Sequence, residues 1–336
     1  MKRSMLYLVC ALAISALPAY AAQDSDKTII YGGEIYSADP HNPHPEAIGI
    51  VGKEIVAVGR YADVLNQLGK NARRMDLQGK YLMPGLIDSH AHVADAGFQT
   101  LTVAFPDGMK DAAAIRAFVE KNANNPRRDI HGVQFYSNVP LSYWDNIGLL
   151  DSVFNSAAYK NTPVALGGAD AHTGWVNQAM LRKAGINDLT LEKADPGIKA
   201  GTVLTPDGKI SGFVTEGAWD HVLSAIPPVD DEKIARAITA GADVMNRFGL
   251  TAWMEPLSNI RPLSPSFNAS PDRRNLGLLP AYVALAKAGK LTAHVSGLAL
   301  VNINSSPAIV DDVIALREQF SQAADIKLVG IKIFQD

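Results

Sequence analysis

Residues 27–82 are dominated by short runs of apolar and β-branched residues. Residues 28–36, 47–51 and 54–59 form such runs, and glycine-containing turns divide or separate them. Runs of this length, bounded by turn residues, are typical of short strands in a small sheet. We therefore expect residues 23–82 to form a small, all-β sandwich domain that is incomplete by itself.

After residue 92 the apolar pattern takes on helical periodicity and alternates with buried runs. Apolar residues at helical spacing predict helices at residues 111–119, 149–159, 232–248, 279–288 and 308–322. Apolar runs predict strands at residues 83–92, 132–136, 163–166, 250–255, 291–301 and 326–334. Strands that alternate with helices imply a parallel sheet with right-handed crossovers, so the fold class is α/β.

Three segments between these elements carry turns or loops. A helix is expected to open at His172 and to reach about Lys183. Residues 187–213 are rich in turn residues, and residues 206–209 form the expected tip of a hairpin. Residues 259–275 are a Ser-, Pro- and Asn-rich loop that follows a strand, where α/β proteins bind ligands.

Composition excludes several classes of protein. The 336 residues are 47% apolar and 19% charged, which is typical of a globular protein and not of a disordered one. The net charge of -3 provides no electrostatic basis for nucleic-acid binding. Cys10 is the only cysteine, so an intrachain disulfide is excluded. The expected partner is a small-molecule substrate, and assembly into a homo-oligomer remains open.

The N-terminus resembles a secretory signal. Lys2 and Arg3 precede an apolar stretch at residues 6–17, and Ala19 and Ala21 form an A-x-A cleavage pattern. Residues 1–22 are therefore expected to be removed by cleavage after Ala21 or Ala22, which would place the protein in a periplasm or outside the cell. The alternative is an uncleaved anchor helix. No membrane contact is expected after cleavage, because no later segment is apolar enough to span a bilayer.

The candidate chemistry begins with a His-x-His pair at the end of an apolar run. On a strand, His90 and His92 would point to the same face, because side chains alternate with a period of two. Asp88 would share that face. Two neighbouring imidazoles can bind one metal ion through their ring nitrogens. The pair therefore predicts a metal site at the end of this strand.

The motifs that follow this pair resemble the amidohydrolase superfamily, and within it the amidohydrolase 3 group that includes N-substituted formamide deformylase-like enzymes. The matching stretches are PGLIDSHAH at residues 84–92, AHTGWVNQAML at 171–181, DGKISG at 207–212, GLTA at 249–252 and GIKIFQD at 330–336. They occur in the family's order and span nearly all of the chain after residue 22.

The resemblance implies a fold as well as a reaction. It implies that residues 83–336 are the first half of a metal-dependent hydrolase (β/α)8 barrel. Barrel strands 1 to 4 would be residues 83–92, 249–255, 291–298 and 326–334, and a long insertion would occupy about residues 95–245. The reaction implied is hydrolysis of a carbon–nitrogen bond that is not a peptide bond, such as an amide or formamide, by metal-activated water.

The same resemblance assigns metal ligands. His90 and His92 match the ligands on strand 1, and Lys332 matches the strand 4 lysine that related enzymes carboxylate to bridge two metals. The expected cofactor is one or two divalent ions, with zinc as the expected metal. Lys327 is a weaker candidate, and Lys332 could instead pair with an acid. No catalytic proton carrier is assigned.

Substrate contacts are expected from the insertion. His172, Trp175 and Asn177 are candidates for pocket lining, and their alternative roles are helix capping and core packing. Glu216 either faces the site or pairs with a nearby cation. Glu255, at the end of strand 2, would point into the barrel mouth. His294 stands where this group more often has arginine, which leaves its role open.

The family's remaining ligands, two histidines on strands 5 and 6 and an aspartate on strand 8, have no counterpart before Asp336. We therefore expect an N-terminal portion of a longer hydrolase, truncated relative to the family, with an open edge at the last strand and little activity alone. The alternative is a non-catalytic exported binding module or pseudoenzyme. A barrel lyase or isomerase is a third class, and the PGLIDSHAH motif argues against it.

Overall fold

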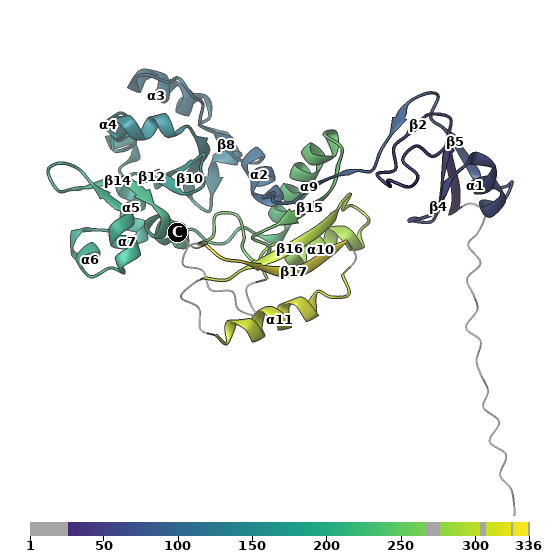
Figure 1. Ribbon diagram of the computed structural model, residues 1–336. Helices are drawn as coiled ribbons and strands as arrows, with labels where there is room; N and C mark the ends of the chain where they lie inside the picture. Colours follow the sequence, from purple (N-terminus) through teal and green to yellow (C-terminus); the bar gives the residue numbers. More distant parts are fainter. Residues whose placement is uncertain (1–25, 267–275, 303–306, 324, 335–336) are drawn as a thin grey trace, which may run out of the picture. The chain divides into compact units, whose positions relative to one another are not determined.

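The computed structural model describes residues 26–266, 276–302, 307–323 and 325–334 (Figure 1). The chain divides into two compact units, unit 1 at residues 1–84 and unit 2 at residues 85–336. The predicted signal at residues 1–22 lies outside the described residues, as do residues 267–275 of the predicted binding loop. Among the helices of the described part, none combines the length and apolar character needed to span a membrane.

Unit 1 contains a four-stranded sheet and a two-stranded sheet. In the larger sheet β1 pairs antiparallel with β3 and parallel with β5, and β3 pairs antiparallel with β4. The smaller sheet pairs β2 with β6 in parallel. The strands are β1 (Lys27–Tyr31), β2 (Glu34–Ile35), β3 (Ala47–Val51), β4 (Glu54–Gly59), β5 (Arg73–Asp76) and β6 (Tyr81–Leu82).

A helix in unit 1 corrects the expectation that residues 27–82 contain only strands. Helix α1 (Tyr61–Leu68) buries Val64 and Leu68. These residues lie four positions apart, on one face of a helix, which is a signal that the strand pattern around them obscured. The helix packs closely on β3, because a Cβ atom at Gly49 would lie only 2.6 Å from Leu68 Cδ1.

The predicted parallel strands of unit 2 form one sheet. Its order is β17-β16-β15-β7, and every neighbouring pair is parallel. Neighbours in this sheet are also successive in the predicted series of barrel strands, so the α/β prediction is confirmed. Within the described residues the sheet is open and does not close into a barrel. The strands are β7 (Leu86–Asp88), β15 (Leu250–Glu255), β16 (His294–Leu300) and β17 (Ile326–Lys332).

Helices pack against this sheet and against each other. Helix α9 contacts β15, and α10 and α11 contact β17. Helices α2 and α9 pack against each other with their backbones close together. A Cβ atom at Gly97 would lie 1.9 Å from Ala237 O, and one at Gly241 would lie 2.3 Å from Val93 O. The helices are α2 (Val93–Thr100), α9 (Asp231–Arg247), α10 (Leu279–Lys287) and α11 (Ile309–Gln319).

The predicted insertion builds a second, mixed sheet. Its order is β13-β14-β12-β11-β10-β8, with β9 added beside β10. The strands are β8 (Val103–Ala104), β9 (Asp129–Ile130), β10 (Val133–Val139), β11 (Val164–Gly168), β12 (Thr173–Val176), β13 (Thr202–Leu204) and β14 (Ile210–Thr215). The helices are α3 (Ala112–Lys121), α4 (Ile147–Phe154), α5 (Gln178–Ala184), α6 (Asp188–Glu192), α7 (Pro196–Gly201) and α8 (Glu216–Ser224), with 3-10 turns η2 (Pro126–Arg128), η3 (Leu141–Asn146) and η4 (Ala157–Tyr159).

The helix predicted from His172 onward is wrong over its first part. Strand β12 occupies that part and pairs antiparallel with β11 and β14, and helix α5 begins only at Gln178. Tertiary pairing with two neighbouring strands overrides the helical spacing read from the sequence. The hairpin predicted around residues 206–209 is present between β13 and β14.

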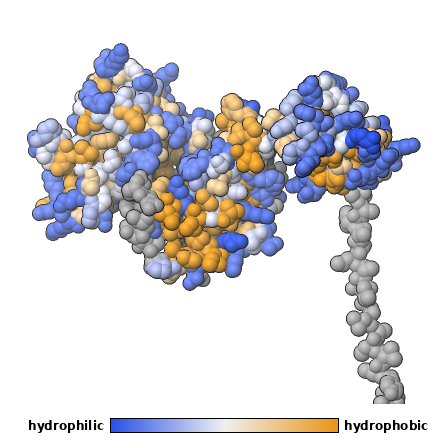
Figure 2. All heavy atoms as spheres, in the orientation of Figure 1, coloured by the Kyte–Doolittle hydropathy of each residue, from blue (hydrophilic) through white to orange (hydrophobic). Residues whose placement is uncertain are grey.

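Strand β17 lies at one edge of the parallel sheet and exposes apolar side chains. Val329, Ile331 and Ile333 are about half exposed, and so are Val310 and Ile314 of α11. Figure 2 shows apolar side chains gathered over this part of unit 2. An apolar strand edge is a template for pairing with another chain.

The exposed edge of β17 predicts self-association that a single charge should suppress. Ile331→Lys places a charge on the edge strand, so the weight-average mass measured by sedimentation equilibrium should fall toward that of the monomer. Val310→Lys is the matched control, because it adds the same charge on α11, away from the strand edge. Equal effects of the two substitutions would contradict pairing through this edge.

Candidate functional site

A tight turn, not a strand, holds the two histidines of the motif together. Strand β7 ends at Asp88, so the predicted strand over residues 83–92 is too long. The Asp88 carboxylate accepts a hydrogen bond from the His90 backbone N–H at 2.9 Å, and His92 is the N-cap residue of α2. The two imidazole centroids lie 5.4 Å apart at an interplanar angle of 76°. The pair that the sequence predicted is therefore brought together by different local geometry.

His92 is half-buried, and its surroundings favour the neutral ring. Burial lowers the pKa of His92 from 6.5 to about 4, and the charges of His90 and Lys332 contribute further. A neutral imidazole offers a nitrogen lone pair at pH 7, which is the form that binds a metal. Nδ1 of His92 is buried without a hydrogen-bond partner and lies 3.9 Å from Glu255 Oε1.

Glu255 occupies the end of β15 and is fully buried. Its Oε2 atom accepts hydrogen bonds from the Ala94 N–H at 3.2 Å and the Tyr282 hydroxyl at 2.9 Å. Burial raises the pKa of Glu255 from 4.5 to about 8, and the nearby Asp95 carboxylate adds to the shift. The sequence placed this acid at a strand end, but its burial beneath α2 could not be read from the strand pattern.

Lys332 ends β17, and its charge contributes to the lowered pKa of His92. Its Nζ atom lies 5.1 Å from the centroid of the Phe334 ring. Lys327, the weaker candidate, and His294, whose role the sequence left open, lie at the opposite end of the sheet. Lys327 is the second residue of β17, and His294 begins β16, where it pairs with Asp325 at 3.0 Å.

A cavity of about 460 Å³ connects the histidine end of the sheet to the insertion. His92 and Asp95 line it from the start of α2, and Phe334 lines it beyond β17. Burial raises the pKa of Asp95 from 3.8 to about 6. Sequence reasoning missed Asp95, although its place in the first turn of a helix that follows His-x-His was a usable signal. Further lining residues come from the insertion and from the loop after β15, among them Phe135, Asp170, His172, Trp219, Ile260 and Arg261.

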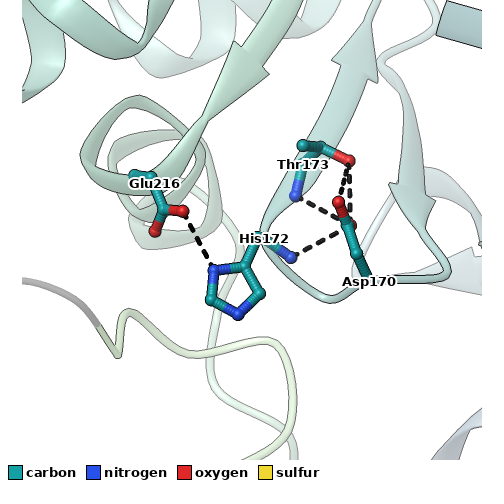
Figure 3. Close-up of polar contacts among 4 residues, drawn as sticks. All are labelled: Asp170, His172, Thr173 and Glu216. Carbon is teal, nitrogen blue, oxygen red and sulfur yellow. Dashed lines mark hydrogen bonds and ion pairs between the residues drawn. The ribbon is translucent and has the colours of Figure 1, made fainter. Parts of the chain in front are cut away.

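His172 and Glu216, both predicted as substrate contacts, lie next to each other (Figure 3), and of the two only His172 lines the cavity. His172 Nδ1 lies 2.9 Å from Glu216 Oε1, and the Glu216 N–H donates to the His172 carbonyl at 2.9 Å. Asp170 fixes the preceding turn, because its carboxylate accepts from the backbone N–H groups of His172 and Thr173. Ala171 and Glu216 both have positive φ, at 63° and 45°. Strained backbone of this kind persists where the surrounding structure holds it in place.

The structure places Trp175 and Asn177 away from the cavity lining. Trp175 is fully buried in the core formed with β10, β11 and α4. Asn177 is the N-cap of α5, and its side chain bonds Val164 N, Met180 N, Phe154 O and Thr162 O at 2.9–3.0 Å. These contacts correspond to the core-packing and capping roles that the sequence left open.

The donors present fit one side of a metal site. Neutral imidazole is a good zinc ligand, and the two rings of the motif lie side by side. Among the residues that the structure describes, no group of three or more His, Cys, Asp or Glu side chains is arranged to hold a metal ion. A lysine ammonium repels cations, so Lys332 fits such a site only in a modified, uncharged or anionic form.

Sequence comparison identifies the chain's relatives. A model described as the amidohydrolase family matches residues 73–336. This chain belongs to the amidohydrolase family. The protein YtcJ of Bacillus subtilis (strain 168) is 27% identical to it over 232 residues, which are 67% of this chain and 41% of YtcJ. The N-substituted formamide deformylase of Arthrobacter pascens is 24% identical over 238 residues, which are 65% of this chain and 42% of the deformylase.

Solved structures agree with this assignment at the level of the fold. A metal-dependent hydrolase of Pyrococcus horikoshii OT3, described as uncharacterized, matches 91% of this chain and 54% of its own, with a TM-score of 0.59 and 15% identity. A second such hydrolase, from Pyrococcus furiosus, gives a TM-score of 0.58 at 17% identity, over 91% of this chain and 55% of that one. The amidohydrolase prediction is thus confirmed. The chain spans about two fifths of the length of the curated relatives it matches.

The hydrogen bonds of Asn177 predict a structural role. Asn177→Ala should lower the free energy of unfolding by about 2–4 kcal/mol, because it leaves buried backbone groups unpaired and removes a helix cap. Urea denaturation measures the change, and Gln178→Ala, at the exposed neighbouring position, is the control. If Asn177→Ala lowered the free energy of unfolding no more than Gln178→Ala does, the structural role would be contradicted.

The raised pKa of Glu255 predicts a pH-dependent stability. Between pH 4.5 and about 8 Glu255 binds more protons in the folded state than in the unfolded state, so its contribution to stability falls as pH rises, by up to about 1.4 kcal/mol for each pH unit. Glu255→Gln should remove this contribution between pH 6.5 and 8, above the range in which His92 and Asp95 contribute, measured by urea denaturation with a metal chelator present. An unchanged slope in the variant would show that Glu255 titrates near its ordinary value.

Proposed function

We propose that this amidohydrolase-family chain is part of a metal-dependent hydrolase that cleaves carbon–nitrogen bonds other than peptide bonds in small molecules, such as amides or formamides. The observation that carries the proposal is the paired imidazoles of His90 and His92, with His92 lining a cavity of about 460 Å³. The deformylase of Arthrobacter pascens, whose name refers to N-substituted formamides, supports this choice of bond.

His90 and His92 would hold the metal, for which we propose zinc as one or two ions. Lys332 would be a further ligand as a carboxylated side chain. Its charge contributes to the lowered pKa of His92, which supports its nearness to the site. A divalent ion bound there would lower the pKa of a water molecule and polarise the carbonyl of the scissile amide. The chain's own contribution is to keep His92 neutral by burial and to exclude water from the inner part of the cavity.

The substrate would lie in the cavity against apolar and polar groups that we assign to binding. Phe135, Trp219 and Ile260 offer apolar contact to a substituent on the amide. His172, aligned by Glu216, offers a hydrogen bond at the same cavity. Most small-molecule sites combine such an apolar lining with a few fixed polar groups.

The described residues supply only part of a metal centre, so we further propose that the 336-residue chain alone has little hydrolase activity. A non-catalytic, exported binding module is the second candidate. The observation that favours it is the cavity with its His172–Glu216 pair, which needs no metal to bind a ligand. Export through a cleaved N-terminal signal, to a periplasm or beyond the cell, is part of both proposals.

Metal binding separates the two functions. The purified chain should bind about one zinc ion per molecule, measured by isothermal titration, and His90→Ala should weaken binding at least tenfold because it removes a ligand. His294→Ala, an exposed histidine at the other end of β16, is the control and should leave affinity unchanged. If the chain bound no zinc, or if His90→Ala left the zinc affinity unchanged, the result would favour the binding module.

A further inference from the structure

Two buried polar atoms at the histidine end of the sheet face each other without a hydrogen bond. They are Nδ1 of His92 and Oε1 of Glu255, which lie 3.9 Å apart. A buried donor or acceptor without a partner costs free energy, so such atoms in a folded protein need an explanation. The separation is about 1 Å longer than a hydrogen bond, a gap that a small rotation of the imidazole closes.

The Glu255 carboxylate is held rigidly behind His92. Its other oxygen accepts from the Ala94 N–H in the first turn of α2 and from the Tyr282 hydroxyl of α10. The Trp253 indole N–H lies 3.4 Å from that same hydroxyl. With the side chain fully buried and one oxygen fixed on two donors, the remaining oxygen is kept in the direction of His92.

The imidazole of His92 separates this carboxylate from the cavity. His92 lines the cavity and its side chain is 37% exposed, whereas Glu255 is fully buried and does not line the cavity. Nδ1 is the buried nitrogen of the ring. The exposed part of the ring is therefore the side that carries Nε2, so the two nitrogens of His92 meet different surroundings.

We propose that Glu255 is a positioning residue for His92: its Oε1 atom accepts a hydrogen bond from Nδ1–H, which fixes that tautomer and leaves the Nε2 lone pair free to bind the metal. Carboxylate groups that orient metal-binding histidines in this way raise metal affinity about 10–100-fold. This inference rests on the proposed function, because it assumes that His92 is a metal ligand. In this arrangement Glu255 lies on the side of His92 that faces away from the cavity, and not in the barrel mouth where the sequence had placed it.

Zinc affinity of the full chain tests the proposal without any measurement of turnover. Glu255→Leu removes the acceptor and should weaken zinc binding about 10–100-fold, while Glu255→Gln keeps an acceptor oxygen and should retain most of the affinity. Glu192→Leu, the same substitution at an exposed position of α6 outside the cavity, is the control and should leave affinity nearly unchanged. Wild-type affinity in Glu255→Leu, or a loss as large as that of His92→Ala, would overturn the positioning role.

The tautomer of His92 gives a second measurement, which would not change if Glu255 had a purely structural role. Nitrogen-15 NMR of the metal-free wild-type chain at about pH 9, where Glu255 is ionised, should show the proton on Nδ1, and Glu255→Leu should shift the population toward the Nε2–H form. A wild-type His92 protonated on Nε2 would overturn the inference even if no variant folds. Failure of wild-type zinc binding, by contrast, would defeat the proposed function itself and so remove the premise of this inference.

Discussion

The buried carboxylate of Glu255 is the constraint on which the arrangement of the histidine end depends. Taking this group out of water is costly, which its raised pKa reflects, and the cost is offset by hydrogen bonds from the start of α2 and from α10. Those bonds tie the first turn of α2 to the end of β15. Because His92 is the N-cap residue of α2, fixing that turn also fixes the backbone that carries the imidazole.

Glycine packing supports the same arrangement from the other side of α2. Gly97 and Gly241 let α2 and α9 approach until backbone atoms touch, and α9 leads directly into β15. Helix α2, helix α9 and strand β15 therefore position one another. The insertion adds the opposite wall of the cavity, where Asp170 and His172 line it, and hydrogen bonds hold His172 between Asp170 and Glu216.

Much of unit 2 follows from local pattern alone. Helix α9 and strands β15, β16 and β17 have long apolar runs or clear helical spacing, which predicted the elements and a parallel sheet. The order of the strands in that sheet was predicted from the family resemblance and agrees with the structure. The histidine pair and the neighbouring His172 and Glu216 were also named from sequence. Three features depended on tertiary contacts that local pattern does not encode. Residues 173–176 form β12 because they pair with two neighbouring strands, and α1 packs its buried residues against β3. Burial beneath α2 determines the surroundings of Glu255.

We propose that His90 and His92 together bind one metal ion at the edge of the cavity. A crystal structure of the zinc-loaded chain, with anomalous diffraction at the zinc edge, tests it most directly. We expect one strong anomalous peak within about 2.1 Å of a ring nitrogen of each histidine, with Nε2 as the ligand atom of His92. Zinc bound elsewhere, or a loaded chain whose two imidazoles stay unbound, would contradict it.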